Sequence, residues 1–125
     1  MSEPTNQTRL GKRVVVTGIG GITALGHDWE AIAASLKAQK NCVVTMGDWD
    51  KYDGLNTRLA APITDFEVPS HYSRKKIRSM GRVSIMATRA SELALIDAGL
   101  LDDPIVSSGQ MGIAYGSSTG STDAI

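Results

Sequence analysis

Three closely spaced glycines near the N-terminus have the residue types of a loop that cradles the phosphates of a dinucleotide. Gly18, Gly20 and Gly21 follow the β-branched run 14–17 and precede a predicted helix. In a dinucleotide-binding loop, a third glycine at fixed spacing lets the helix pack closely on the strand. Thr23 occupies that position here. The sequence therefore offers only part of the loop that hydride transfer with a nicotinamide nucleotide would require.

Further residues argue against a nucleotide site. The reductase variant of the loop has glycines where this chain has Ile22 and Ala24. No acid ends a second strand about twenty residues on, where it would hold the ribose, since Asp48 and Asp50 lie in a predicted loop. No Walker lysine follows, which excludes a P-loop. We interpret the glycines as a tight turn against a neighbouring element, and keep a nucleotide-dependent reductase as a minor alternative that titration with NADPH tests.

A second set of residues that could bind a partner is a cluster of Lys and Arg in a stretch without Asp or Glu. Six basic residues lie between Glu67 and Glu92, where there is no Asp or Glu: Arg74, Lys75, Lys76, Arg78, Arg82 and Arg89. Because the chain has 13 basic and 13 acidic residues in total, this is a local patch, and no global charge favours nucleic acid. From the residues alone, a solvated helix face or internal salt bridges are the commoner explanation, and a docking surface is the alternative.

The composition is that of a globular chain, with 42% hydrophobic and 21% charged residues among 125. Cys42 is the single cysteine, which excludes an intramolecular disulfide framework and fits a reducing compartment. The first ten residues are mostly polar, so we expect no signal peptide, and no apolar run is long enough to cross a membrane. We therefore expect a cytoplasmic protein without a membrane partner, with a flexible tail over residues 1–11.

The first half of the chain alternates strand and helix signals. Residues 14–18 are apolar on both faces and predict a central, buried strand. A helix should begin near His27 or Asp28, where the Asp28 carboxylate can cap it, and end by 39–41. Residues 42–56 are rich in Gly, Asp and Asn and predict a loop. A second strand is expected over 57–63.

The second half is dominated by one long helix. Ser70 is expected to cap a short helix over 71–78. Apolar residues at helical spacing predict the long helix from about 80 to 98, with an apolar surface broad enough to need cover on more than one side. Gly99 is a suitable C-terminal cap. A third strand is predicted over 111–115.

After this third strand, a turn of small residues leads to a possible helix start at Ser121 or Thr122. The pattern predicts an α/β fold, and the ending predicts that residues 12–125 are the truncated front part of a larger fold. The apolar central strand and helix should then need partners that these 125 residues do not supply.

Together these motifs resemble the N-terminal part of a β-ketoacyl-[acyl carrier protein] synthase of the elongating, type II kind, in the thiolase superfamily. The matching residues are the opening Arg-Val-Val-Val-Thr-Gly-Ile-Gly at 13–20, the pair Leu25-Gly26 before a helix with a tryptophan, the run Ser-Arg-Lys-Lys-Ile-Arg-Ser-Met at 73–80, Ala-Gly-Leu at 98–100 and Gly-Ile-Ala-Tyr-Gly-Ser at 112–117. The motifs follow one another in the family's order from Lys12 onward.

The resemblance implies a fold and an activity. The fold would be the N-terminal portion of a thiolase-like fold, an incomplete set of α-β-α-β-α layers, in a protein that usually forms a homodimer. The activity would be an acyltransferase reaction: decarboxylative Claisen condensation of an acyl thioester with malonyl carrier protein, in fatty-acid or polyene biosynthesis. The implied partners are acyl carrier protein and its acyl and malonyl thioesters. No cofactor and no metal is implied.

The resemblance places the catalytic cysteine and both catalytic histidines beyond this stretch. In the family a helix N-terminus activates the cysteine, and backbone N–H groups hold the thioester oxyanion. Cys42, His27 and His71 match none of these positions. Cys42 is interpreted as a small apolar residue, and no catalytic residue is expected in this stretch.

Binding residues are implied within the stretch. Lys75 and Arg78 match basic positions with which the family docks the acidic carrier protein. A third basic position of that motif is Ser79 here, and Arg74 and Lys76 could compensate for it. We therefore expect these four cations to bind carrier protein through charges that steer the encounter.

Thr119 matches a family position at the bottom of the acyl pocket, near the dimer interface, that is often Ile or Gly. A hydroxyl there is unfavourable for a saturated chain and favours an unsaturated or aryl-tipped acyl chain. The runs 115–122 and 49–54 look closest to paralogues associated with aryl polyene pathways. The alternative is a neutral turn residue in an ordinary fatty-acid synthase.

A different class of protein has the same fold: a non-catalytic, chain-length-factor-like subunit of a condensing-enzyme heterodimer, which lacks the nucleophile. The residue at the nucleophile position, beyond Ile125, would distinguish the two.

Overall fold

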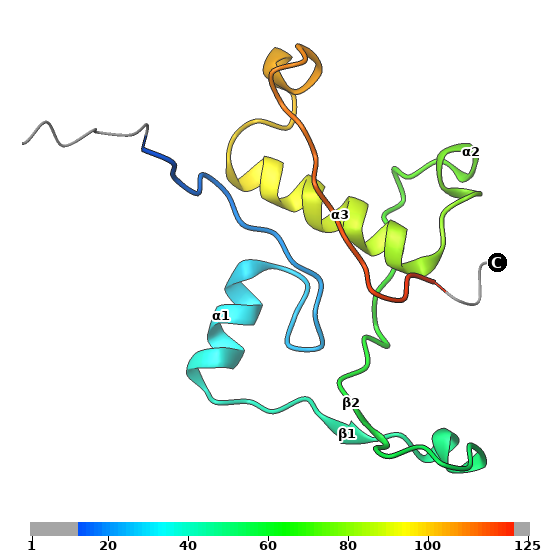
Figure 1. Ribbon diagram of the computed structural model, residues 1–125. Coiled ribbons are helices and arrows are strands. Elements are labelled where there is room, and N and C mark those ends of the chain that lie inside the picture. Colours follow the sequence, from blue (N-terminus) through cyan, green and yellow to red (C-terminus); the bar gives the residue numbers. More distant parts are fainter. Residues whose placement is uncertain (1–12, 122–125) are drawn as a thin grey trace, which may run out of the picture.

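The computed structural model describes residues 13–121, arranged around one long helix (Figure 1). The elements in chain order are α1 (Trp29–Lys37), β1 (Val44–Thr45), the 3₁₀ helix η1 (Gly47–Lys51), β2 (Leu59–Ala60), α2 (Arg74–Ile77), α3 (Arg82–Asp97) and the 3₁₀ helix η2 (Pro104–Ser107). The predicted tail over 1–11 and the predicted helix start at Thr122 lie outside the described residues.

The first helix forms as predicted. The Asp28 Oδ1 atom accepts a hydrogen bond of 2.8 Å from the Ala31 N–H, which satisfies one of the donors that the first turn leaves free. The helix ends after Lys37, and Gln39 adopts a positive φ of 54°. Ile32, on the inner side of α1, is 8% exposed. Sequence and structure therefore agree on how α1 begins.

The segment after α1 differs from the prediction. β1 and β2 form a two-stranded antiparallel arm that pairs Val44 with Ala60. The predicted loop 42–56 thus contains β1 and η1, and the predicted strand 57–63 shortens to two residues. An ion pair of 2.7 Å between Arg58 Nε and Asp50 Oδ1 ties η1 to the returning chain.

The long helix is confirmed, and the cap of the short one is corrected. Gly99 has φ 69° and its N–H donates to the Ile96 carbonyl at 3.0 Å, which terminates α3 as predicted. Ser73, not Ser70, occupies the N-cap position of α2. The reason is a turn in which the Tyr72 N–H donates to the Pro69 carbonyl at 2.9 Å, so the chain at Ser70 is already part of that turn.

The two predicted strands at 14–18 and 111–115 are wrong as strands: the structure has neither. Their side chains are largely exposed, with Val14 at 93%, Val16 at 80% and Ile113 at 80%. A strand requires a neighbour that pairs its N–H and C=O groups. Among residues 13–121 neither stretch has such a neighbour.

Ile32 is the single buried hydrophobic residue among those described. Ile85 and Leu95 on α3 are half-buried, whereas Ile96 is half exposed. The extent of exposed apolar surface agrees with the expectation that the apolar stretches need further partners. Within the described part, no helix is both long and apolar enough to span a bilayer.

Candidate functional site

The glycine loop packs on the backbone of α3. A Cβ atom added to Gly18 would lie 2.3 Å from the Ala94 carbonyl oxygen, and one added to Gly20 would lie 2.2 Å from that of Ala90. The Ile19 N–H donates to Asp97 Oδ2 at 2.9 Å. The loop that would have to face a phosphate therefore faces a helix, which confirms the interpretation of these glycines as a tight structural turn.

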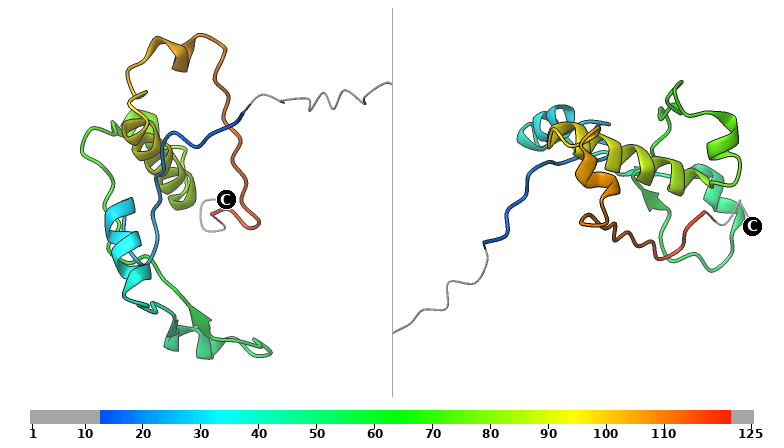
Figure 2. Two further views of the ribbon diagram at one scale, coloured as in Figure 1. Left: turned by 90° about the vertical axis from the view of Figure 1, so that its left-hand side faces the viewer. Right: turned by 90° about the horizontal axis from the view of Figure 1, so that it is seen from above.

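The same loop contacts α1 on its other side (Figure 2). The Ser35 hydroxyl of α1 donates to the Leu25 carbonyl at 3.0 Å, and a Cβ on Gly21 would lie 3.4 Å from Ile32 Cδ1. Thr23 and Gly26 close the turn through two backbone hydrogen bonds of 2.9 and 3.2 Å. The loop thus sets the spacing between α1 and α3.

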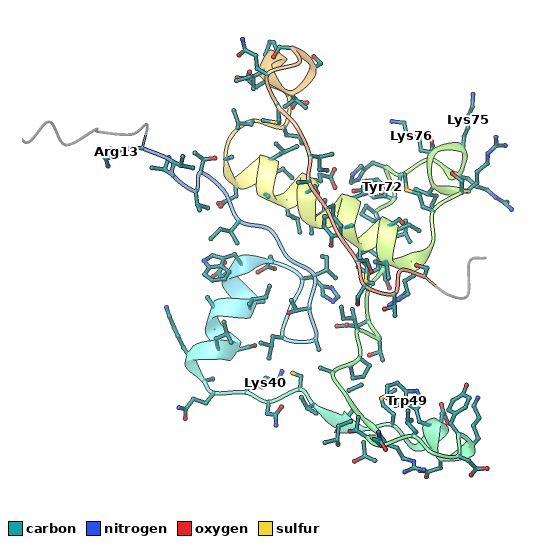
Figure 3. All side chains as sticks on the ribbon, in the orientation of Figure 1. Arg13, Lys40, Trp49, Tyr72, Lys75 and Lys76 are labelled. Carbon is teal, nitrogen blue, oxygen red and sulfur yellow. The ribbon has the colours of Figure 1, made fainter. Side chains whose placement is uncertain are left out.

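Four of the six clustered cations are exposed on one short segment, which we call the basic segment (residues 73–79). Arg74, Lys75, Lys76 and Arg78 are all exposed, and no carboxylate among the described residues lies within 4.0 Å of them. Ile77, which lies between these cations in the chain, is half-buried. Figure 3 shows Lys75 and Lys76 at the outer side of α2, away from α3.

The other two cations serve the fold. Arg82 Nη2 donates to the Ile63 carbonyl at 2.7 Å, and its guanidinium lies 5.7 Å from the centre of the Phe66 ring. Arg89 Nη1 donates to Glu92 Oε2 at 2.6 Å. The salt-bridge explanation weighed for the patch therefore applies to Arg89, whereas the basic segment keeps its charge available.

A polar cluster that the sequence analysis missed joins the beginning of the basic segment to α3. The Glu92 carboxylate, 17% exposed, binds the Tyr72 hydroxyl at 2.9 Å, His71 Nε2 at 2.6 Å and Arg89 Nη1 at 2.6 Å. The His71 and Tyr72 rings meet edge to face, with centroids 4.8 Å apart. The signal in the sequence was that Glu92 ends the acid-free stretch, three residues after Arg89.

The partners of Glu92 fix its charge state. Burial tends to raise the pKa of its carboxyl, but the hydrogen bonds from Arg89, Tyr72 and His71 outweigh this and hold the pKa below its usual value. Burial, followed by the hydrogen bond to Glu92, raises the pKa of Tyr72 to about 12. The pair therefore consists of a carboxylate and a protonated phenol at neutral pH.

This shift predicts an acid-dependent stability. Because the carboxyl pKa of Glu92 is lower in the folded state than in the unfolded one, its contribution is present above about pH 4.3 and is lost as the pH falls through the folded value. We expect the difference in unfolding free energy between the intact protein and its Glu92→Gln variant to shrink below about pH 4. Urea denaturation at a series of pH values measures this difference. A difference that stays constant from pH 7 to pH 3 would contradict the assignment.

Thr119 is exposed and is not among the residues that line the hollow beside its own turn. Its neighbours Ser117 and Gly120 do line this hollow of about 410 Å³, which lies between α3 and the chain after it. The Gly120 N–H donates to Ser117 Oγ at 2.9 Å, and the Val83 N–H donates to Ser121 Oγ at 3.0 Å. The turn around Thr119 is thus held against the first turn of α3.

The single cysteine and the two histidines, whose side chain types could act in catalysis, are not brought together. His27 Nε2 lies 3.2 Å from Asp65 Oδ1, and the imidazole ring meets Phe66 edge to face. His71 belongs to the Glu92 cluster, and Cys42 is a half-buried free thiol. None of the three is hydrogen-bonded to another in the described part of the chain.

Comparison with known proteins identifies what this arrangement resembles. The family model described as the N-terminal domain of β-ketoacyl synthase matches residues 11–125. A crystal structure of a β-ketoacyl synthase from Burkholderia phymatum is 59% identical, with a TM-score of 0.77, and the match covers 86% of this chain and 26% of that one.

Curated relatives agree. The 3-oxoacyl-[acyl-carrier-protein] synthase 1 of Haemophilus influenzae is 33% identical over 88% of this chain and 26% of its own length. Synthase 2 of Vibrio harveyi is 30% identical over 91% of this chain and 27% of its own length. Nodulation protein E of Rhizobium meliloti is 30% identical over 73% of this chain and 22% of its own length. This chain therefore spans about a quarter of the length of the relatives it matches.

Proposed function

Because the chain belongs to the β-ketoacyl synthase family, we propose that the intact protein is a 3-oxoacyl-[acyl carrier protein] synthase. The α/β fold is that of the N-terminal part of a thiolase-like protein. The observation that carries the proposal is the match over residues 11–125, together with the 59% identity to a β-ketoacyl synthase of known structure. The proposed reaction joins an acyl thioester to malonyl carrier protein with loss of CO₂, in fatty-acid or polyene biosynthesis.

The role of these residues in that reaction would be binding. The basic segment, through Lys75 and Arg78 with Arg74 and Lys76 beside them, would receive the acidic carrier protein. Support comes from the exposure of all four cations and from the lack of a nearby carboxylate among the described residues. A rim of free charge of this kind accelerates encounter and discriminates against positively charged partners.

Acyl transfer to the intact protein tests the proposed activity. The nucleophile would attack the thioester carbonyl of an acylated carrier protein and release the carrier-protein thiol. Incubation with acylated carrier protein should therefore add the mass of one acyl group to the protein. Malonyl carrier protein should then remove it, with release of CO₂ and 3-oxoacyl carrier protein. The Cys42→Ser variant should behave like the wild type, because Cys42 lies in no assembled site. A protein that takes up no acyl group would favour the chain-length-factor-like alternative.

We also propose that Thr119 contributes to acyl-chain selection. The turn that carries it is fixed to α3 through Ser121 and borders the hollow beside that helix. Replacement of its hydroxyl by a methyl group, in Thr119→Val, should raise kcat/KM for saturated acyl carrier proteins by about three- to tenfold relative to unsaturated ones. Competition assays with paired substrates measure the ratio. Ser118→Ala is the control in the same turn, and an unchanged ratio in Thr119→Val would indicate a neutral turn residue.

The proposed assembly is a dimer, either of identical subunits or with a paralogue, in the cytoplasm. This assembly is what the resemblance to the β-ketoacyl synthase family implies. Light scattering of the intact protein measures the mass of the assembly, and a monomer would contradict this part of the proposal.

A further inference from the structure

We infer that Glu92 is a positioning residue that holds the basic segment in the orientation needed to dock an acidic carrier protein. This inference rests on the docking role proposed above. We call Glu92, Tyr72, His71 and Arg89 the clamp. The Glu92 carboxylate is 17% exposed and its bonds go to the three other members of the clamp, so its effect would pass through the placement of the cations.

The clamp holds the N-terminal end of the basic segment, which is the end that is not joined to α3 through the backbone. At its C-terminal end the segment runs directly into α3 at Arg82. At its N-terminal end it is joined to α3 by the bonds from Tyr72 and His71 to Glu92. Glu92 lies ten residues beyond Arg82, about 15 Å along the helix. The segment is therefore held at two separate points of one rigid element.

Among residues 13–121, no ion pair joins the basic segment to another element, and its backbone hydrogen bonds stay within the segment and its immediate neighbours. Inside it, the hydrogen bonds run between near neighbours, such as those from Lys76 and Ile77 to the Ser73 carbonyl at 2.8 and 3.3 Å. α2 is a single turn of four residues, too short to be stable by itself. Figure 3 shows Tyr72 beside α3 and Lys75 beyond it on the outer side. Without the clamp, the cations would sample many orientations, and docking would then cost additional ordering entropy.

Electrostatics and positioning predict effects of opposite sign, which makes the inference testable. Removal of the negative charge of Glu92 makes the surface more positive and should by itself strengthen the binding of an acidic protein. Loss of the clamp should weaken that binding. A weaker complex after Glu92→Gln would therefore show that Glu92 acts by positioning the cations and not through its own negative charge.

The experiment compares four forms of the intact protein: wild type, Glu92→Gln, Tyr72→Phe and the double variant. Tyr72→Phe keeps the ring and removes only the hydroxyl that binds Glu92. Glu67→Gln, an exposed carboxylate outside the clamp, is the matched control for the charge change. Three quantities are measured for each form. The first is the Kd for acyl carrier protein, and the second is the rate of hydrogen exchange of amides 73–79. The third is kcat and KM, both with acylated carrier protein and with an uncharged acyl-pantetheine as substrate.

We expect Glu92→Gln to raise the Kd and the KM for carrier protein about fivefold, with kcat and the pantetheine reaction unchanged. Amides 73–79 should exchange faster. Tyr72→Phe should act in the same direction, and the double variant should be less than additive because the two residues share one bond. Glu67→Gln should bind as tightly as the wild type or slightly more tightly.

The outcomes separate the two proposals. If the wild type has no affinity for carrier protein, the docking role fails and the inference fails with it. If the wild type binds but Glu92→Gln binds equally well or more tightly, the clamp fails and the docking role stands. A fall in thermal stability with unchanged Kd would show that the cluster is structural only, which overturns the inference.

Discussion

Reversal of Lys75 and Arg78 to glutamate is expected to weaken binding of acyl carrier protein by about thirtyfold at low salt, equivalent to about 2 kcal/mol. Both side chains are exposed, and neither has a carboxylate partner among the described residues that would be released by the change. The effect should therefore arise from repulsion of the acidic partner. Kd values from calorimetry or fluorescence titration at several salt concentrations measure this effect. The difference in Kd between the variant and the wild type should narrow as salt screens the charges.

The chain offers a matched control. Lys37 and Lys40 are also exposed and lie at the end of α1, where Figure 3 shows Lys40 well apart from Lys75. Their reversal to glutamate changes the net charge by the same amount. We expect it to change the Kd far less when both variants are compared at about 0.1 M salt, where the effect of exposed charges falls off beyond about 10 Å. An unchanged affinity of the Lys75/Arg78 variant at low salt would contradict the docking role.

The second large effect concerns the glycine loop. Gly20→Ala is expected to destabilise the intact protein by about 3 kcal/mol, with a clear fall in Tm. The added Cβ would lie 2.2 Å from the Ala90 carbonyl oxygen and 2.6 Å from the Ala94 nitrogen. These are backbone atoms of a helix and cannot turn aside as a side chain would. Loop and helix must therefore separate, at the expense of the packing around α3.

Gly21→Ala is the adjacent control. Its added Cβ would meet only Ile32 Cδ1, at 3.4 Å, and Gly21 has no positive φ. We expect it to be neutral or slightly stabilising, since alanine restricts the unfolded chain more than glycine does. Thermal and urea unfolding of both variants test this contrast. Equal stability of Gly20→Ala and wild type would show that the loop does not approach α3 as closely as the structure indicates.

Sequence reasoning was most reliable where a feature depends on a few neighbouring residues. The Asp28 cap, the end of α3 at Gly99 and the structural role of the glycines all follow from local stereochemistry. The family was also recognisable, because several separated motifs follow one another in the same order, and a family model confirms it. The roles of Lys75, Arg78 and Thr119 remain predictions.

Strands and side-chain partners were less predictable. Residues 14–18 and 111–115 have the composition of buried strands, yet a strand exists only when another backbone pairs with it, and the described residues provide none. The Ser70 cap was wrong because a turn at Pro69 shifts the helix start to Ser73. Strand pairing thus depends on residues that are distant in the sequence, whereas the helix start is a local feature that the pattern misplaced by three residues.

The sequence by itself determined the family, the long helix and the presence of a cationic stretch, since these depend on residue type, order and periodicity. Only the tertiary structure decided which cations are free. It engages Arg82 and Arg89 within the fold, leaves Lys75 and Arg78 exposed, and places Glu92 against Tyr72, twenty residues away. The physical reason is that a charge becomes available or neutralised through its neighbours in space, which the order of residues does not specify.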